Sequence, residues 1–207
     1  MRIVPDGLYY ALGLTLAGIV LSFLLTPWLG IPFYILAAFC LYFFRDPERV
    51  APAGDFMLAP ADGKVVAIRE IGPDETRISI FLNLFNVHVN RTPIPGIVTS
   101  IIYREGKFLV ASHESASSDN EQNTLIVEGR GTRVVCRQIA GLIARRIVCY
   151  KKTGDSLAPA ERIGYIKFGS RVDVLYGPEW KTIAKVGDKV FAGTSILASR
   201  MSPPEAI

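Results

Sequence analysis

The stretch Tyr165-Ile166-Lys167-Phe168-Gly169-Ser170-Arg171-Val172-Asp173 decides the fold of this 207-residue chain. Two short runs rich in aromatic and β-branched residues flank its Gly-Ser pair, as strands flank a turn or a bulge. Similar runs, each bounded by Gly, Pro, Asn or Asp, lie at 64–68, 77–81, 86–90, 124–127, 133–136, 146–150, 165–168, 172–176 and 195–198. Short strands at this spacing predict a mainly β, barrel-sandwich-like soluble domain.

Two segments of this domain echo each other, Ala-Asp-Gly-Lys-Val within 60–66 and Gly-Asp-Lys-Val within 186–194. Such glycine-anchored hairpins occur in the barrel-sandwich folds of lipoyl and biotinyl carriers. A carrier also needs an exposed lysine at a hairpin tip, and none is evident, so the echo predicts architecture and not a swinging arm. Residues 138–145 are the best candidate for a short helix, and residues 112–123 read as a polar loop.

The N-terminal region has a different composition, because residues 7–44 contain no Asp, Glu, Lys or Arg. Residues 8–26 form an apolar run long enough to cross a hydrocarbon core about 30 Å thick as a helix. Prolines and a glycine within 27–32 interrupt the run, and residues 33–44 resume it. The sequence predicts a helical hairpin, or one span followed by a re-entrant or interfacial segment. We therefore expect a membrane-associated segment at 1–50 and a β domain at 51–207.

The charges beside this segment predict its orientation. Arg2 precedes it, and Arg45 and Arg49 follow it, which favours both ends, and the β domain, on the cytoplasmic side of the cell membrane. A cleaved signal peptide and a buried core hairpin are the alternatives. Thr26-Pro27-Trp28 is a poor cleavage site, and a core hairpin would normally show polar positions at helical spacing.

Composition also excludes several classes of protein. The net charge is +4, and no basic tract interleaved with aromatic residues is present, which argues against nucleic acid as a partner. The three cysteines, Cys40, Cys136 and Cys149, have no metal-ligand spacing. Isolated thiols argue for a reducing compartment and against a disulfide scaffold or a metal site.

The Gly169-Ser170 bond can carry unusual chemistry. A serine hydroxyl can attack the preceding carbonyl and convert the peptide bond to an ester. Removal of the serine α-proton then expels the upstream chain and leaves dehydroalanine, which hydrolyses to a pyruvoyl group. Glycine before the serine tolerates the dihedral angles that such an attack requires. A hairpin or bulge that uses Gly for shape and Ser for a hydrogen bond is the simpler alternative.

Two further residues are candidates for proton transfer. His88 lies in Val87-His88-Val89-Asn90, where alternation places His88 and Asn90 on one face and the valines on the other. Imidazole suits proton transfer near neutral pH, although a strand histidine is more often structural. Asp62, in an Asp-Gly pair that is commonly a turn, could orient the imidazole of His88 and stabilise its charged form.

Taken together, five motifs resemble the short (type A) branch of the phosphatidylserine decarboxylase family. They are Phe43-Phe44-Arg45-Asp46-Pro47-Glu48-Arg49, Pro60-Ala61-Asp62-Gly63, Asn86-Val87-His88-Val89-Asn90-Arg91, residues 138–147 and Phe168-Gly169-Ser170-Arg171-Val172-Asp173. The resemblance implies a proenzyme that cleaves itself into chains 1–169 and 170–207, which stay together as a heterodimer and can oligomerise further.

The resemblance also implies the reaction. Ser170 becomes the pyruvoyl cofactor, whose carbonyl forms a Schiff base with the amine of phosphatidylserine in the membrane. Carbon dioxide leaves and phosphatidylethanolamine is released, a step of phospholipid biosynthesis. Asp62 and His88 match positions that assist self-cleavage, and His88 is also a candidate proton donor in the decarboxylation. The sequence leaves open whether the lipid is diacyl or an archaeal ether lipid.

The chain departs from the longer branch of the family at two places. That branch usually has Leu-Gly-Ser-Thr at the cleavage site, and it has a second histidine where this chain has Phe85. Arg171, next to the expected pyruvoyl group, is a candidate for contact with phosphate or carboxylate. Two alternatives remain: a non-enzymatic, membrane-tethered barrel-sandwich module, and a hydrolase that uses Ser170, His88 and Asp62 as a triad. The hydrolase lacks a G-x-S-x-G elbow.

Overall fold

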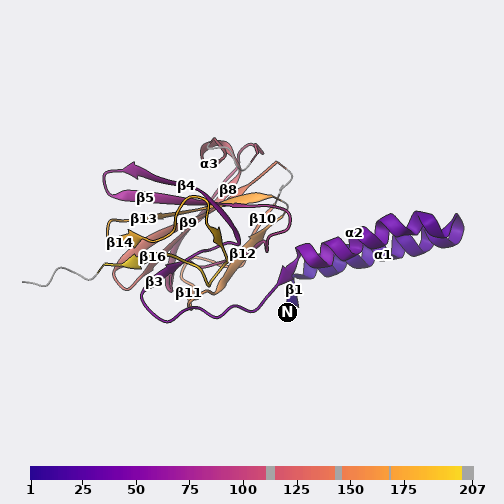
Figure 1. Cartoon of the computed structure of the whole chain (residues 1–207), viewed down its shortest axis with the longest axis horizontal. Helices are drawn as coiled ribbons and strands as arrows, with labels where there is room; N and C mark the ends of the chain where they lie inside the picture. Colours follow the sequence, from indigo (N-terminus) through magenta and orange to yellow (C-terminus); the bar gives the residue numbers. More distant parts are fainter. Residues whose placement is uncertain (111–114, 143–145, 168, 202–207) are drawn as a thin grey trace, which may run out of the picture. The chain divides into compact units, whose positions relative to one another are not determined.

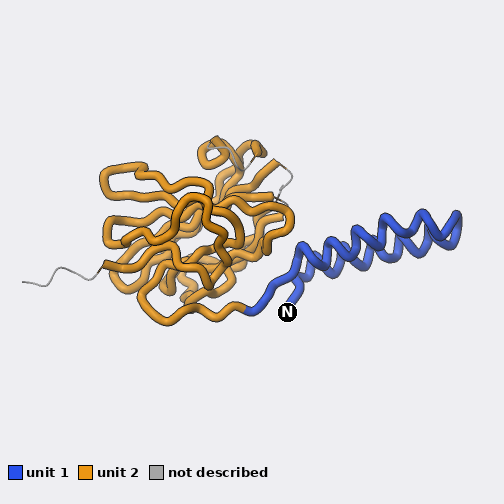
Figure 2. Tube along the Cα trace, in the orientation of Figure 1, with its two compact units in different colours: residues 1–48 blue, residues 49–207 orange. Residues whose placement is uncertain are grey.

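The computed structural model describes residues 1–110, 115–142, 146–167 and 169–201, and it divides the chain into two compact units (Figures 1 and 2). The first unit is Met1–Glu48 and the second is Arg49–Ile207.

The first unit is a helical hairpin. Helix α1 (Pro5–Leu24) and helix α2 (Pro27–Phe43) run side by side, and strands β1 (Arg2–Ile3) and β2 (Arg45–Asp46) pair antiparallel at their open end (Figure 1). The 20 residues of α1 are long and apolar enough to cross a membrane, whereas α2 has 17 residues. The expected hairpin is therefore present. Its two chain ends are held together by β1 and β2.

The second helix begins earlier than the sequence predicted. Pro27 is its first residue, where a fixed φ and a missing N–H cost nothing, so this proline starts a helix and does not interrupt one. Gly30 lies against α1: a Cβ atom there would come within 2.7 Å of the Gly18 carbonyl oxygen and 2.0 Å of Ser22 Oγ. Small residues let the two backbones approach closely, as they do in membrane helix pairs. The outward side chains are apolar and exposed, including Phe23 at 87%.

The second unit is built on an eight-stranded antiparallel sheet that curls into a half-barrel (Figure 1). Its order is β11-β7-β8-β9-β13-β5-β4-β15, and the described residues also form two three-stranded sheets, β10-β12-β6 and β14-β16-β3. The strands are β3 (Phe56–Leu58), β4 (Gly63–Gly72), β5 (Glu75–Leu82), β6 (Val89–Arg91), β7 (Gly96–Arg104), β8 (Gln122–Gly129), β9 (Thr132–Ala140), β10 (Ile147–Cys149), β11 (Ser156–Leu157), β12 (Arg162–Ile166), β13 (Ser170–Tyr176), β14 (Trp180–Thr182), β15 (Lys189–Val190) and β16 (Ile196–Arg200). The prediction of a mainly β domain preceded by an apolar helical hairpin is confirmed.

Strand β13 is central to the sheet and is buried on both faces. Val172 and Val174 belong to the apolar core together with Ile78 and Ile80 of β5. The opposite face of β13 carries charged residues that are also buried. The strand therefore alternates polar and apolar residues although all seven of its residues are buried, and its charged face is covered by the chain and not by water.

The two echoing sequence segments pair with each other. Strand β15 lies antiparallel to β4, with Val190 opposite Gly63. Gly187 N–H donates to the Val65 carbonyl, and Val65 N–H donates to the Asp188 carbonyl. Gly63 is required at this contact because a Cβ atom would come within 2.3 Å of the Phe81 carbonyl oxygen of β5. The repeated motif thus closes one side of the domain.

Three local predictions were wrong in part. The candidate helix at 138–145 begins with the last three residues of β9, and residues 143–145 lie outside the described part of the chain. The expected loop at 112–123 contains a four-residue helix, α3 (Ala116–Asp119), and the start of β8, while 112–114 are not described. The strand expected at 86–90 starts only at Val89 and reaches Arg91, and residues 87 to 90 are all buried. Strand β7 was not predicted.

Candidate active site

Gly169 lies in the link between β12 and β13 and has a left-handed backbone, with φ of +67°. Apart from its two chain neighbours, no atom of the described residues lies within 4 Å of the position that a Cβ atom would occupy. Glycine is therefore favoured here by its backbone conformation and not by lack of space. The residue before it, Phe168, lies outside the described residues.

Ser170 follows as the first residue of β13 and is fully buried. It lies opposite Leu82 of β5 on one side and Ala140 of β9 on the other, so two neighbouring strands fix its backbone. Its Oγ atom is buried and has no hydrogen-bond partner among the described residues. A buried hydroxyl that is not used by the fold is uncommon and is available for chemistry.

The segments before and after His88 are both hydrogen-bonded to the chain around Gly169-Ser170. The chain leaves β5 at Leu82, opposite Ser170, and turns through Asn83–Asn86 before it reaches His88. The Asn83 side chain accepts from Phe85 N–H at 2.9 Å, and the Asn86 side chain accepts from Asn83 N–H at 2.9 Å, which fixes the turn. The His88 carbonyl then accepts from the N–H of Ile166, the last residue of β12. Both segments that flank His88 are thus hydrogen-bonded to the segments that flank Gly169-Ser170.

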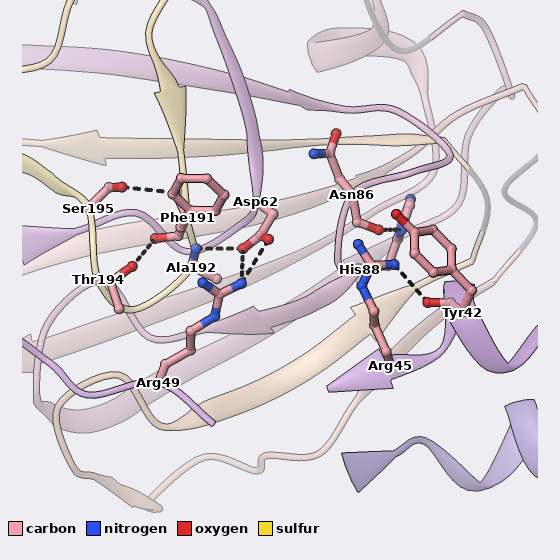
Figure 3. A network of polar contacts seen from close by, with 10 residues as sticks. All are labelled: Tyr42, Arg45, Arg49, Asp62, Asn86, His88, Phe191, Ala192, Thr194 and Ser195. Carbon is pink, nitrogen blue, oxygen red and sulfur yellow. Dashed lines mark hydrogen bonds and ion pairs between the residues drawn. The ribbon is translucent and has the colours of Figure 1, made fainter. Parts of the chain in front are cut away.

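The hydrogen bond of the His88 ring determines which nitrogen can act as a base. The ring is 2% exposed, and Nδ1 lies 3.0 Å from the Asn86 carbonyl oxygen (Figure 3). A carbonyl oxygen can only accept, so Nδ1 carries the proton and the neutral ring has its lone pair on Nε2. A main-chain carbonyl therefore fixes the tautomer and the orientation of the ring.

Asp62 is buried, and two groups fix its carboxylate (Figure 3). Arg49 Nη2 lies 2.9 Å from Oδ2 and 3.2 Å from Oδ1, and Ala192 N–H donates to Oδ1 at 2.8 Å. The side chain of Arg49 is itself 18% exposed and lies over the ring of Phe191. Asp62 thus links the start of the second unit to β4 and to the segment after β15. Its action on His88 stays a prediction.

A chain of buried amides near the site was not predicted. Asn123 Nδ2 donates to Gln138 Oε1 at 3.0 Å, and Gln138 Nε2 donates to Asn90 Oδ1 at 2.9 Å. The far end of the chain, Asn90 Nδ2, is buried and has no partner among the described residues. Gln138 lies opposite Val172 in the register, diagonal to Ser170 and on the same face of the sheet. One indication of this amide chain was present in the sequence, which was the placement of Asn90 on the same strand face as His88.

Arg171 is only 1% exposed. Its Nε donates to Asp173 Oδ1 at 2.7 Å, and its Nη2 donates to Ser79 Oγ at 2.6 Å. The side chain lies on the face of β13 opposite to that of Ser170, because successive side chains of a strand alternate. Arg171 therefore stabilises the charged face of the sheet, and the geometry does not support contact with a substrate at Ser170.

Comparison with known proteins identifies the family. The phosphatidylserine decarboxylase family model matches residues 36–198. A phosphatidylserine decarboxylase proenzyme from Solibacter usitatus is 56% identical over 201 residues, which cover 97% of this chain and 98% of the relative. The proenzyme from Nitratidesulfovibrio vulgaris is 43% identical over 214 residues, which cover 100% and 98%.

The chain belongs to the phosphatidylserine decarboxylase family. It is therefore a pyruvoyl-dependent carboxy-lyase made as a proenzyme, of the short-chain size. Proenzymes of this family carry a pyruvoyl group that derives from a serine. The full-length matches extend over the helical hairpin as well as the β domain.

Phe85 stands where the longer branch of phosphatidylserine decarboxylases has a second histidine. In this chain it lies in the turn before His88, and its ring is 66% exposed. It brings no side-chain donor or acceptor to the site.

Proposed function

We propose that this chain cleaves itself between Gly169 and Ser170, and that the resulting pyruvoyl group decarboxylates phosphatidylserine to phosphatidylethanolamine. The observation that carries the assignment is the pairing of a left-handed glycine with a fully buried serine whose Oγ has no partner among the described residues. The same geometry fits a pyruvoyl group at position 170, because the buried Ser170 Oγ has no other use among the described residues. Ser170 begins a central strand, so a group formed from it would be held rigidly at the end of β13.

Self-cleavage requires Ser170 Oγ to lose its proton and attack the Gly169 carbonyl carbon. The C–N bond then breaks and the Gly169 acyl group moves to Oγ as an ester. Loss of the Ser170 α-proton expels the Gly169 carboxylate, and dehydroalanine remains. Hydrolysis releases ammonia and leaves the pyruvoyl group at the start of the 38-residue chain 170–207.

His88 is the base that we assign to the first step. Its Nδ1 is protonated by the hydrogen bond to the Asn86 carbonyl, so Nε2 is the atom able to take the Ser170 proton. Asp62 is assigned as a positioning residue. Its buried negative charge stabilises the imidazolium that forms when His88 accepts the proton, and Arg49 fixes the orientation of the carboxylate.

Asn90 is the donor that we assign to the attacked carbonyl. When Oγ adds to the Gly169 carbonyl, its oxygen becomes negatively charged and needs a hydrogen-bond donor in a water-excluded site. Asn90 Nδ2 is buried, has no acceptor among the described residues, and is held by an amide chain that lies beside β13. Such a donor is already oriented, so its contribution requires no reorganisation during the reaction.

A pyruvoyl group held at position 170, at the start of β13, would supply a carbonyl for the substrate amine and an electron sink that allows the carboxyl group to leave as carbon dioxide. His88, whose Nε2 can hold a proton after cleavage, is assigned to protonate the product carbon.

We infer that the two chains remain associated as a heterodimer. Seven residues of β13 pair with β5 and the same seven pair with β9, and both partner strands belong to the larger chain. Strands β15 and β16 of the small chain pair with β4 and β3. The small chain is therefore built into two sheets, and cleavage of one backbone bond removes none of these pairings.

The hairpin supports a location at the cell membrane with the β domain in the cytoplasm. Pairing of β1 with β2 holds Arg2 and Arg45 together, so both ends of the hairpin lie on one side. Positive residues at both ends favour the cytoplasmic side. The substrate lies in the same membrane.

Denaturing electrophoresis with intact-mass measurement tests the proposal, on wild type, Ser170→Ala and the control Ser156→Ala, an exposed serine of β11. The wild type and the control should give a small chain of about 4 kDa, since 38 of 207 residues of a 22.7-kDa chain follow Gly169. Ser170→Ala should stay whole. An active wild type that remains uncut would overturn the self-made cofactor and would favour the triad hydrolase or the tethered module.

A further inference from the structure

A pocket of about 360 Å³ lies over the face of the eight-stranded sheet opposite to that of Ser170. We call it the arginine pocket; its lining residues are Arg77 of β5, Arg104 of β7, Arg137 of β9, and Ser115, Ser117 and Ser118 in and beside α3. Arg137 lies opposite Asp173 in the register, and Ser117 donates to Asp173. Since Asp173 and Ser170 point to opposite faces of β13, this pocket is separate from the active site.

The carboxylate of Asp173, on this face of β13, already has hydrogen-bond and ion-pair partners. Asp173 Oδ1 accepts from Arg171 Nε, and Asp173 Oδ2 accepts from Ser117 Oγ at 2.7 Å, while Arg77 Nε lies 3.9 Å from Oδ2. The face thus holds Arg77, Arg137 and Arg171 around one carboxylate. The local charge is positive.

Arg137 is the group that this arrangement leaves unused. Its guanidinium makes no hydrogen bond or ion pair with any residue in the described ranges, and its Nε is buried. Burial lowers the pKa of Arg77; Asp173 opposes this effect, and the positive charges of Arg171, Arg69 and Arg137 add to it. Like charges gathered at a half-buried position repel each other, and an anion in the pocket would relieve that repulsion.

The number and kind of donors point to the ligand. A carboxylate is matched by one guanidinium fork, whereas this pocket is lined by three guanidinium groups. The hydroxyl groups of Ser117 and Ser118 already donate to Asp173 and to the Ser115 carbonyl, and Arg104 Nη2 donates to the Ser118 carbonyl, so the remaining guanidinium N–H groups are the donors that a ligand would meet. A tetrahedral phosphate presents three or four oxygens in different directions and can accept from several forks at once. The pocket also has the volume of a small-molecule site.

We propose that the arginine pocket binds a phosphate group, either free or as the phosphodiester of a lipid headgroup. The proposal does not depend on the self-cleavage chemistry, because the pocket lies on the other face of β13. It nevertheless concerns the same strand, so a bound phosphate stabilises the folded domain in which Ser170 is held.

The test measures the thermal unfolding midpoint of the purified full chain with increasing inorganic phosphate, against sodium chloride at equal ionic strength. Phosphate should raise the midpoint of the wild type. Arg137→Gln should weaken phosphate binding at least about tenfold, since it removes a charged donor. Arg133→Gln is the matched control, because it removes the same charge from an exposed position of the same strand outside the pocket.

Arg104→Gln is a second pocket variant in case Arg137→Gln does not fold. The sources of phosphate are separated by glycerol 3-phosphate and glycerophosphoglycerol, the second of which carries the phosphodiester of a lipid headgroup. Tighter binding of the diester supports a headgroup ligand, and tighter binding of the monoester or of inorganic phosphate supports a free one. Absence of any shift, or equal weakening by the Arg133→Gln control, would overturn the proposal.

Discussion

Replacement of Gly169 by alanine should slow self-cleavage without damaging the fold elsewhere. The φ of Gly169 is +67°, and a Cβ atom there would meet no atom within 4 Å in the described part of the chain beyond its two neighbours. The cost is therefore the backbone strain of a left-handed L-residue alone, about 1–2 kcal/mol, which corresponds to roughly a 5- to 30-fold change in an equilibrium. If attack by Ser170 requires this conformation, the cleavage rate should fall by the same factor.

The matched control is Gly131→Ala. Gly131 has φ of +73° in the turn between β8 and β9, and the nearest atom to its added Cβ is Arg200 Nη2 at an ordinary 3.6 Å. It should bear similar strain far from the cleavage site in sequence. A time course of uncut precursor after synthesis measures both variants, and Gly169→Asn should fall between glycine and alanine because Asn tolerates this region better. The reasoning would be refuted if Gly169→Ala were cleaved at the wild-type rate, or if Gly131→Ala slowed cleavage equally.

Three further outcomes are expected. His88→Asn carries an amide nitrogen on Cγ, as Nδ1 is, so it can still donate to the Asn86 carbonyl, but it has no basic nitrogen, and its chain should stay uncut on denaturing gels; normal cleavage would exclude His88 as the base. Asn90→Leu should slow ester formation by roughly 10²- to 10³-fold. Hydroxylamine splits an ester, so it should not cut the precursor of Asn90→Leu, in which the ester has not formed. If hydroxylamine does cut this precursor, the ester has formed and Asn90 acts in a later step. Burial raises the pKa of Glu161, but hydrogen bonds from Lys151 and a backbone N–H outweigh it and hold that pKa below its usual range. Its ionised form therefore stabilises the fold above the unfolded pKa, and this contribution is lost as pH falls through the folded pKa. Glu161→Gln should make urea stability less sensitive to acid than in the wild type, and an unchanged acid dependence would contradict this.

Much of the fold could be predicted because its strands carry local signals. Strands β4, β5 and β8 were found from β-branched residues between turn residues, and the apolar helices from the absence of charge. The end of β9 was missed because Gln138 is polar yet fully buried, so its environment depends on Asn90 and Asn123, which are distant in sequence. The four residues of α3 have no helical pattern of their own, and contact with Asp173 helps to hold them.

The site was predictable to a different extent. Gly169 and Ser170 are adjacent in sequence, so their chemistry could be proposed without a fold. The hydrogen-bond partner of His88 could not be found in the same way, because the Asn86 acceptor is a main-chain carbonyl and every residue carries one. The partner of Asp62 was likewise hidden, since Arg49 lies just after the apolar segment, where a basic residue was interpreted as a membrane-orientation signal.

The central position of β13 requires that folding come before cleavage. Strand β13 needs β5 and β9 on either side, so it must be inserted while the polypeptide is still continuous and can fold as one molecule. After the proposed cut at Gly169-Ser170, the 38 residues that hold β13 to β16 would become a separate fragment with no intact sheet of its own. If the mature protein is unfolded, the two fragments must find each other by diffusion, and the broken backbone bond does not re-form. The working life of each molecule is therefore set by how slowly it unfolds and not by its folding equilibrium.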